Sequence, residues 1–449
     1  MVILTYGMET AFFRFNEQET DKEKVFSTGL ISLLVTSVLF LVLVSVFSQQ
    51  LASLIDYANN SEYVIWFAWI LAIDAISAIP FARLRAQNKS GRFASIKMAG
   101  IAINIVLNLV LIVLCPWLLK HSDEKFITGL VNFFYRPDWG IEYIFISNLV
   151  SSAIVLALLI PEIISVKLKV DPVFWRKMFI YAFPLLFAGM AGIVNETFDR
   201  LLLRYLLPKD VATYQVGIYS ACYKISIFMT IFIQAYRYAA EPFFFAQAKE
   251  KDSKVLYARI MDYFIITVSL IFLATMLYLD DIILRFRFIG KEYWSGRAII
   301  PVQMMAHLFL GVYYNLSIWY KLTGKTIWGA WLAGIGAVIS LGLNLWWIPL
   351  SSDHLIFGYY GSAWATFICY FSMMVISYFV GQKYFPVKYN LLKFFGYLGL
   401  AVLLYFISTI VRPEHTLLRI SFNTFLLAVF CLGVLITEKP FQNRKPILT

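Results

Sequence analysis

Residues 83–109 read RLRAQNKSGRFASIKMAGIAINIVLNL, and residues 319–345 read WYKLTGKTIWGAWLAGIGAVISLGLNL. The two stretches align at a constant offset of 236 residues, which places Gly100 on Gly336. Each stretch is a basic loop that leads into an apolar helix with a glycine on its packing face and an asparagine two turns further along. The alignment predicts that the chain contains two copies of one structural unit.

A second match supports the duplication. The stretch AFFRFNEQETDKEK, from Ala11, resembles PFFFAQAKEKDSKV, from Pro242, at an offset of 231 residues. Two matches in the same order at nearly one offset are typical of an internal repeat.

The composition places this repeat in a membrane. Of the 449 residues, 60% are hydrophobic and only 14% are charged, which excludes a soluble globular protein. Apolar runs long enough to cross a bilayer predict twelve spans after a short opening segment. The predicted spans are 26–48, 63–82, 94–119, 141–164, 178–207, 214–245, 258–279, 298–320, 326–350, 357–381, 391–411 and 417–437.

The repeat offset covers six spans, an even number, so both copies cross the membrane in the same direction. We therefore expect an all-α, polytopic membrane protein with two pseudo-symmetric six-helix lobes and a trailing helix pair. The expected parts are an N-terminal lobe at 1–164, a C-terminal lobe at 165–386 and the trailing helices at 387–449.

The opening segment MVILTYGMETAFFRF corresponds, through the repeat, to the inner half of the span 214–245. A counterpart of the span 178–207 would precede Met1 by some 50 residues on the same offsets. We therefore expect the first lobe to lack its first helix and Met1 to be an internal methionine of a longer protein.

Basic residues in the loops predict the orientation. With the loop after the opening segment on the cytoplasmic side, 24 lysine and arginine residues, Lys97 among them, fall on that side and 11 on the other. The bias predicts a cytoplasmic C-terminus. It also accounts for much of the net charge of +11 without a nucleic-acid partner.

Four stretches carry a family resemblance: TYGMETAFFRF at 5–15, PFARLRAQNKSGRFASIK at 80–97, FDRLLLRYLLP at 198–208 and VGIYSACYKI at 216–225. They resemble the polysaccharide flippase branch of the multidrug, oligosaccharidyl-lipid and polysaccharide (MOP) exporter superfamily. The resemblance covers essentially the whole chain. The family has fourteen helices, in two lobes of six and a trailing pair, with both termini cytoplasmic.

The resemblance implies transport of an oligosaccharide on an undecaprenyl diphosphate lipid across the bacterial inner membrane, for cell-surface polysaccharide synthesis. The head group would pass between the lobes by alternating access while the prenyl tail stays in the bilayer lipid. We expect a monomer that needs no cofactor. We also expect no metal site, because the four cysteines lack metal-ligand spacing.

Ionisable residues at membrane depth are the candidate functional groups, since each is costly there. Glu196, Arg200 and Arg204 stand at i, i+4 and i+8 on one helical face, with Asp199 beside them. Either this stripe faces the other lobe and offers guanidinium groups to diphosphate oxygens, or Glu196 and Arg200 neutralise each other near the outer interface.

Further candidates lie in the next span and in the opening segment. Lys224 lies about ten residues into its span, which predicts an aqueous cleft or a carboxylate beside it. Arg237 with Glu241, and Glu9 with Arg14, lie at matched depth in the two lobes and are candidates for an inner gate or for interfacial anchoring.

Asp74 lies in the middle of a span, so proton or sodium coupling is one interpretation and a hydrogen bond to a neighbouring helix is the other. The equivalent polar pairs Asn104 with Asn108 and Ser340 with Asn344 are expected to join helices. His307 is expected to be a packing residue. The candidate substrate-binding residues are thus Arg200, Arg204, Lys224 and Arg237, and the candidate gate or coupling residues are Glu9, Arg14, Asp74, Glu196, Asp199 and Glu241.

Two other functions compete with the flippase. A membrane glycosyltransferase or polymerase usually needs a sizeable outer loop that carries catalytic groups, and the longest outer loop here, about 120–140, holds few. A cation-coupled drug or metabolite antiporter of the same superfamily is the closer rival. Lys224, Arg200 and Arg237 favour an anionic substrate over a cationic one.

Overall fold

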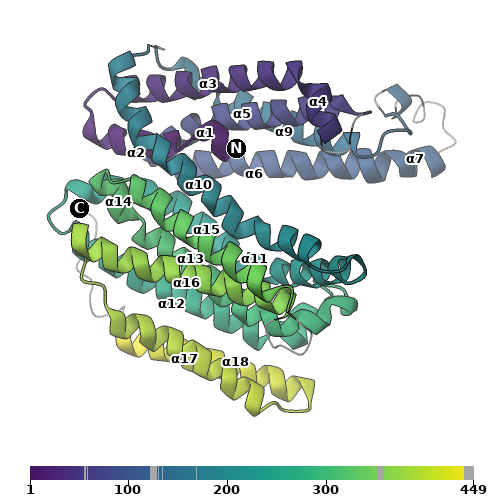
Figure 1. The fold of residues 1–449 in the computed structure, drawn as a ribbon, viewed down its shortest axis with the longest axis vertical. Helices are drawn as coiled ribbons and strands as arrows, with labels where there is room; N and C mark the ends of the chain where they lie inside the picture. The colour runs from purple at the N-terminus through teal and green to yellow at the C-terminus, as the bar shows by residue number, and fades with distance from the viewer. Residues whose placement is uncertain are drawn as a thin grey trace. The chain divides into compact units, whose positions relative to one another are not determined.

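The computed structural model describes residues 1–54, 57, 59–121, 129, 131–133, 135–167, 169–350 and 357–438. Within these residues twelve helices are long and apolar enough to cross a membrane, as the sequence predicts (Figure 1). The first half of the chain contains α1 (Val2–Thr5), α2 (Met8–Gln18), α3 (Lys22–Val46), α4 (Ser48–Leu54), α5 (Ser61–Ala86), α6 (Ser90–Asn108), the π-helix η1 (Leu109–Leu114), α7 (Cys115–His121) and α9 (Glu142–Ile164).

The second half begins with two long helices, each of which covers one predicted span. Its elements are α10 (Pro172–Leu206), α11 (Lys209–Ala246), the 3-10 helix η2 (Gln247–Lys249), α12 (Ser253–Leu277), the π-helix η3 (Leu279–Leu284), the 3-10 helix η4 (Lys291–Ile299), α13 (Ile300–Leu316), α14 (Ile318–Thr323), α15 (Ile327–Trp347), α16 (Tyr359–Tyr384), α17 (Leu391–Ile410) and α18 (Thr416–Glu438).

Two compact units make up the chain, Met1–Leu186 and Phe187–Thr449. The division falls inside α10, whereas the sequence places it in the polar loop before α10. The first half of α10 packs within the first unit: the indole Nε1 of Trp175 donates to Ser32 Oγ of α3 at 2.7 Å, and Phe174 packs edge-on against Phe15 of α2. The trailing helices belong to the second unit.

Helices pack in the same order in both units. In the first unit α5 contacts α2, α3 and α9, and α6 packs against α9. In the second unit α13 contacts α11, α12 and α16, and α15 packs against α16. The helices α3 and α12 also begin and end 231 residues apart, at the offset of the second sequence match. The predicted repeat is therefore present in the packing as well as in the sequence.

The aligned glycines occupy equivalent helix crossings. At Gly100 a Cβ atom would lie 2.7 Å from Val155 Cγ2 of α9, and at Gly336 one would lie 2.3 Å from Met373 Sδ of α16. The carbonyl oxygens of both glycines accept hydrogen bonds from the opposing helix, from Ser151 Oγ at 2.7 Å in α9 and from Cys369 Sγ at 3.2 Å in α16. Close approach of the backbones explains why glycine is needed at both places.

The aligned asparagines are also equivalent. Asn108 Nδ2 donates to the carbonyl oxygen of Asn104, and Asn344 Nδ2 donates to that of Ser340, both at 2.8 Å. Asn344 also joins helices, since its Oδ1 accepts from Ser362 Oγ of α16 at 2.7 Å, whereas Asn108 has no such interhelical bond to any residue that the structure describes. The expected interhelical role is thus seen in the second unit.

The opening segment is not one continuous helix. It breaks between α1 and α2 at Tyr6 and Gly7, whose φ angles are 30° and 76°. A Cβ atom at Gly7 would lie 2.7 Å from the carbonyl oxygen of Ala182 and from Leu185 Cβ. A positive φ and the close approach of α10 therefore both select glycine here.

The trailing pair α17 and α18 is attached to α12 and to the turn after it by ionic contacts at both ends. At one end Lys393 Nζ lies 2.7 Å from Glu438 Oε1 and 3.5 Å from Asp262 Oδ2 of α12. At the other end Arg412 binds Asp280 at 2.6 Å, and Arg419 binds Asp281. Each contact joins a basic residue of the trailing pair to a carboxylate. The carboxylates of Asp262, Asp280 and Asp281 belong to the preceding lobe.

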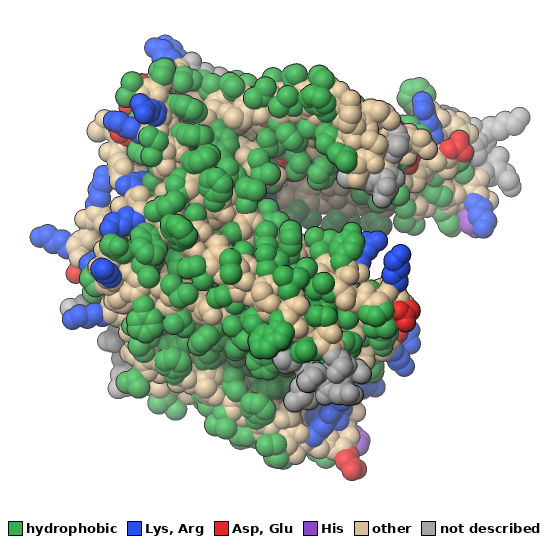
Figure 2. All heavy atoms as spheres, viewed as in Figure 1, with side chains coloured by type: hydrophobic (Ala, Val, Ile, Leu, Met, Phe, Trp, Pro, Cys, Tyr) green, Lys and Arg blue, Asp and Glu red, His purple; other side chains and the backbone are tan. Residues whose placement is uncertain are grey.

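Outward-facing side chains suit a lipid surrounding. Figure 2 shows hydrophobic side chains over most of the visible surface, with lysine and arginine gathered at helix ends. Large apolar residues of the spans are widely exposed, for example Val338 at 72% and Phe379 at 68%. Exposed apolar surface of this extent marks a membrane-facing molecule.

The crossing of α15 and α16 gives a testable prediction. We expect Gly336→Ala to destabilise the protein by about 1–3 kcal/mol, because the new methyl group overlaps Met373 and Asn195. Gly334→Ala in the same helix meets no atom within 4 Å and should stabilise the protein by about 0.5–1 kcal/mol through the helix propensity of alanine. Thermal unfolding in detergent measures both, and equal effects of the two substitutions would contradict the assigned crossing.

Candidate functional site

Each unit contains an equivalent ion pair between two of its helices. In the first unit Arg85 of α5 binds Glu9 of α2. In the second, Lys321 Nζ of α14 lies 2.9 Å from Glu241 Oε1 of α11. Arg85 and Lys321 are aligned in the repeat, so the two pairs join corresponding helices.

These ion pairs change the interpretation of the charges at matched depth. The sequence groups Glu241 with Arg237 and Glu9 with Arg14, but each carboxylate bridges to a cation of another helix. The guanidinium groups of Arg14 and Arg237 lie over tyrosine rings, at 4.6 Å from the centroid of Tyr181 and 4.0 Å from that of Tyr314. Glu9 and Glu241 are thus members of two ion pairs within their own units, and a gating role for them and for the two arginines stays a prediction.

A polar pocket in the first unit contains Asp74. Its volume is about 390 Å³, and its walls come from α5, α6 and α9. Besides Asp74 the lining includes Lys97, and the two charges interact across the pocket. Its further polar residues are Ser77, Asn104, Asn148, Ser151 and Ser152.

Lys97 is a member of this site that the sequence analysis missed, because it was counted with the cytoplasmic loop. It lies two turns inside α6, and its Nζ stands 4.4 Å from the ring centroid of Phe81. Its position seven residues into an apolar helix was the available signal. Asp74 is therefore not an isolated carboxylate.

The charged stripe of α10 meets tyrosines of α11. Asp199 is buried and accepts a hydrogen bond from the Tyr219 hydroxyl. Glu196 Oε1 accepts from the Tyr223 hydroxyl at 3.2 Å, and the Arg200 guanidinium lies 4.3 Å from the centroid of the same ring. Among the described residues Glu196 and Arg200 form no direct ion pair within 4.0 Å, so the structure does not show the mutual neutralisation that was one of the two interpretations of this stripe. Both side chains bind Tyr223 instead.

His307 extends this network further into the interior of the second unit. Its Nε2 lies 3.1 Å from the Tyr223 hydroxyl, and its Nδ1 lies 2.7 Å from the carbonyl oxygen of Gln303. His307 is 2% exposed, and its ring packs edge-on against Tyr223. His307 is thus a packing residue, as its isolated position predicts, and both of its ring nitrogens have polar partners.

Lys224 and Arg204 differ from cations of the second unit that bind carboxylates, such as Lys321 and Lys393. Both are exposed within helices that can span a membrane. In the part of the chain that the structure describes, neither has a hydrogen-bond or ion-pair partner. They are therefore two of the basic groups of this unit with charge available for a ligand.

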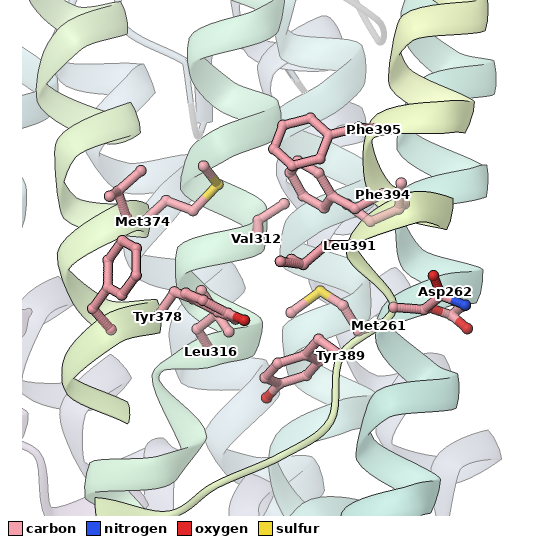
Figure 3. A pocket seen from close by; sticks show the side chains of 14 residues that line it. Met261, Asp262, Val312, Leu316, Met374, Tyr378, Tyr389, Leu391, Phe394 and Phe395 are labelled. Carbon is pink, nitrogen blue, oxygen red and sulfur yellow. The ribbon is translucent and has the colours of Figure 1, made fainter. Parts of the chain in front are cut away.

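An apolar pocket of about 280 Å³ lies between α12, α13, α16 and the start of α17 (Figure 3). Met261, Met374, Tyr378, Phe394 and Phe395 are among its lining residues, and Asp262 lies at its edge. Such a lining suits a hydrocarbon chain and offers little to a phosphate or a sugar.

In the described residues no group of three or more His, Cys, Asp or Glu side chains is arranged to hold a metal ion.

The ion pair between Glu241 and Lys321 can be tested by a double-mutant cycle. Both side chains are 15% exposed, so removing one partner leaves a poorly solvated charge. We expect the unfolding free energies of Glu241→Gln, Lys321→Gln and the double variant to give a coupling of about 0.5–3 kcal/mol. Glu241→Gln combined with Lys388→Gln, in an exposed loop, should be additive, and additivity in both cycles would show that the pair contributes no coupling.

No family model and no curated protein matches the sequence. Solved structures do match. A mutant of the Vibrio cholerae MATE transporter VcmN has 14% identity and a TM-score of 0.65, with 85% of this chain and 84% of that chain covered. A multidrug resistance MATE family transporter of the MOP superfamily, in an outward-facing conformation, has 12% identity and a TM-score of 0.65, with 85% and 83% covered. At such identities the likeness establishes the fold, and the chain has the fold of these MATE transporters.

Proposed function

We propose that this chain is a membrane transporter that moves an anionic, lipid-linked oligosaccharide across the bacterial inner membrane by alternating access, and not an enzyme. The fold supports transport, and the sequence resemblance supports the substrate class. The single observation that carries the choice of an anion is the charge balance within the spans of the second unit.

Two carboxylates within these spans have partners, while two of the cations do not. Asp199 accepts from Tyr219, and Glu241 is paired with Lys321. Lys224 and Arg204 are exposed without partners among the described residues. An unpaired cation in a spanning helix is costly unless water or an anion reaches it. A diphosphate supplies several oxygen acceptors for ammonium and guanidinium groups.

A cation-coupled drug antiporter is the second candidate, since one of the similar structures is described as a multidrug resistance transporter. A cationic drug needs an accessible carboxylate, and Asp74 in the polar pocket of the first unit is the place for it. Lys97 lines the same pocket, however, and its charge opposes a cationic ligand. We propose that Asp74 serves coupling to a proton instead, because protonation neutralises the carboxylate without placing a further cation beside Lys97.

The orientation follows from the loop charges and remains part of the proposal. It places the C-terminus in the cytoplasm, and residues 439–449 lie outside the described part of the chain. The paired ends of the two units, at Glu9 and Glu241, would then lie on the cytoplasmic side.

A binding experiment separates the two substrates. The protein in lipid nanodiscs should bind undecaprenyl diphosphate, and Lys224→Ala with Arg204→Ala should weaken that binding by about a hundredfold, because each of the two lost charge-assisted contacts contributes about 1.4 kcal/mol. Lys388→Ala, an exposed loop lysine, is the matched control and should bind like the unaltered protein. Native mass spectrometry gives the bound fractions. Tight binding of the cation ethidium that is unchanged in the double variant, without binding of the diphosphate, would favour the antiporter.

A further inference from the structure

A line of three polar side chains leads from an exposed position into the interior of the second unit. Glu196 on α10 is exposed, Tyr223 on α11 is half-buried and His307 on α13 is buried. Hydrogen-bond distances of 3.2 Å and 3.1 Å connect them through the tyrosine hydroxyl, and the Nδ1 of His307 reaches the Gln303 carbonyl oxygen at 2.7 Å. The line therefore contains three hydrogen bonds.

These three bonds need three hydrogens. The carbonyl oxygen of Gln303 can only accept, so Nδ1 carries a hydrogen, and the tyrosine hydroxyl supplies one more. A neutral imidazole with Nδ1 protonated has no hydrogen on Nε2, and an ionised carboxylate has none. When His307 is neutral and Glu196 is ionised, the line holds only two hydrogens, one on Nδ1 and one on the tyrosine hydroxyl. The hydroxyl can donate to Nε2 or to Glu196 but not to both, so one of these two acceptors has no donor.

We infer that the line from Glu196 through Tyr223 to His307 is a proton-binding site, which takes up one proton as the imidazolium of His307. In the protonated form Nε2–H donates to the tyrosine oxygen, and the tyrosine hydroxyl donates to Glu196 Oε1. All three bonds are then made. The inference rests on the proposed transporter and names the proton as an ion that this unit binds.

The surroundings make the charge of His307 depend on Glu196. Burial disfavours an imidazolium, whereas the carboxylate reached through Tyr223 favours it. Arg200, over the Tyr223 ring, acts against the added charge. Among the described residues, the charged groups that act on His307 are Glu196 and Arg200 of α10, and none of them belongs to α12. Tyr223 of α11 and Tyr370 of α16 are the titratable side chains whose rings pack against it.

Loss of the proton redirects the tyrosine hydroxyl. Without a hydrogen on Nε2, the hydroxyl donates to His307, and Glu196 loses its bond to α11. Protonation thus ties α10 to α11 and α13 through Tyr223, and deprotonation releases α10 at this point. A transporter can use such a link to couple a proton to a change in helix packing.

Selective labelling tests the inference directly, because the chain has only four histidines. Nitrogen NMR of the ¹⁵N-histidine-labelled protein in nanodiscs, without substrate, distinguishes the imidazolium from the neutral tautomers, and His307→Gln assigns the signal. We expect His307 to convert from imidazolium to the neutral Nδ1–H tautomer as the pH rises between about 5 and 8.

Two variants separate the proton site from a merely structural contact. In Glu196→Gln the new amide can donate to the tyrosine oxygen, so three bonds form without an added proton, and the imidazolium signal of His307 should be lost throughout the range. In Tyr223→Phe the link is cut, so adding Glu196→Gln should cause no further change in the titration. Glu250→Gln and Tyr205→Phe, both at exposed positions, are the matched controls.

A His307 that stays neutral in the unaltered protein, or that titrates unchanged in Glu196→Gln, would overturn the inference. Because no substrate is present in the measurement, either result would leave the transport proposal to its own binding test. Loss of undecaprenyl diphosphate binding with a normal His307 titration would instead overturn the substrate and leave the proton site standing.

Discussion

The demand that every charge in an apolar surrounding finds a partner shapes this molecule more than any other constraint. Lipid offers no hydrogen bonds, so an unpaired ion within a span is costly. Glu9 and Glu241 meet cations of neighbouring helices, Asp199 meets a tyrosine, and Asp281 meets an arginine of the trailing pair. Lys224 and Arg204 are exposed cations without a partner among the described residues, and this difference from the paired charges makes them candidates for ligand binding.

The two units show how one packing scheme can carry different chemistry. Their helices meet in the same order, with a glycine and an ion pair at corresponding places. The first unit contains a polar pocket around Asp74 and Lys97. The second unit contains the line of hydrogen bonds that leads from exposed Glu196 through Tyr223 to buried His307. Backbone approach and charge pairing are thus shared by the units, while the polar residues between the helices differ.

Hydropathy and periodicity predict most of the fold. They predict the twelve spans, the repeat and the packing glycines, because each of these features depends on a short continuous stretch of the chain. The partners of the charges were not predictable in this way. Glu241 and Lys321 are 80 residues apart, and Tyr223 and His307 are 84 apart, so only the packing of whole helices brings them together. Lys97 was missed because a lysine near a span end resembles a loop residue until the start of the helix is known.

The clamp between α12 and the trailing helices has a consequence for biosynthesis. Asp262 and the two aspartates at 280 and 281 are bound by Lys393, Arg412 and Arg419. These cations are synthesised more than 100 residues after the carboxylates that they bind. At a translation rate of about 5–20 residues per second, the acidic groups wait several seconds for their partners. The second lobe therefore completes its charge pairing only when the last two helices leave the ribosome, and premature termination before α17 would leave all three carboxylates exposed to quality control.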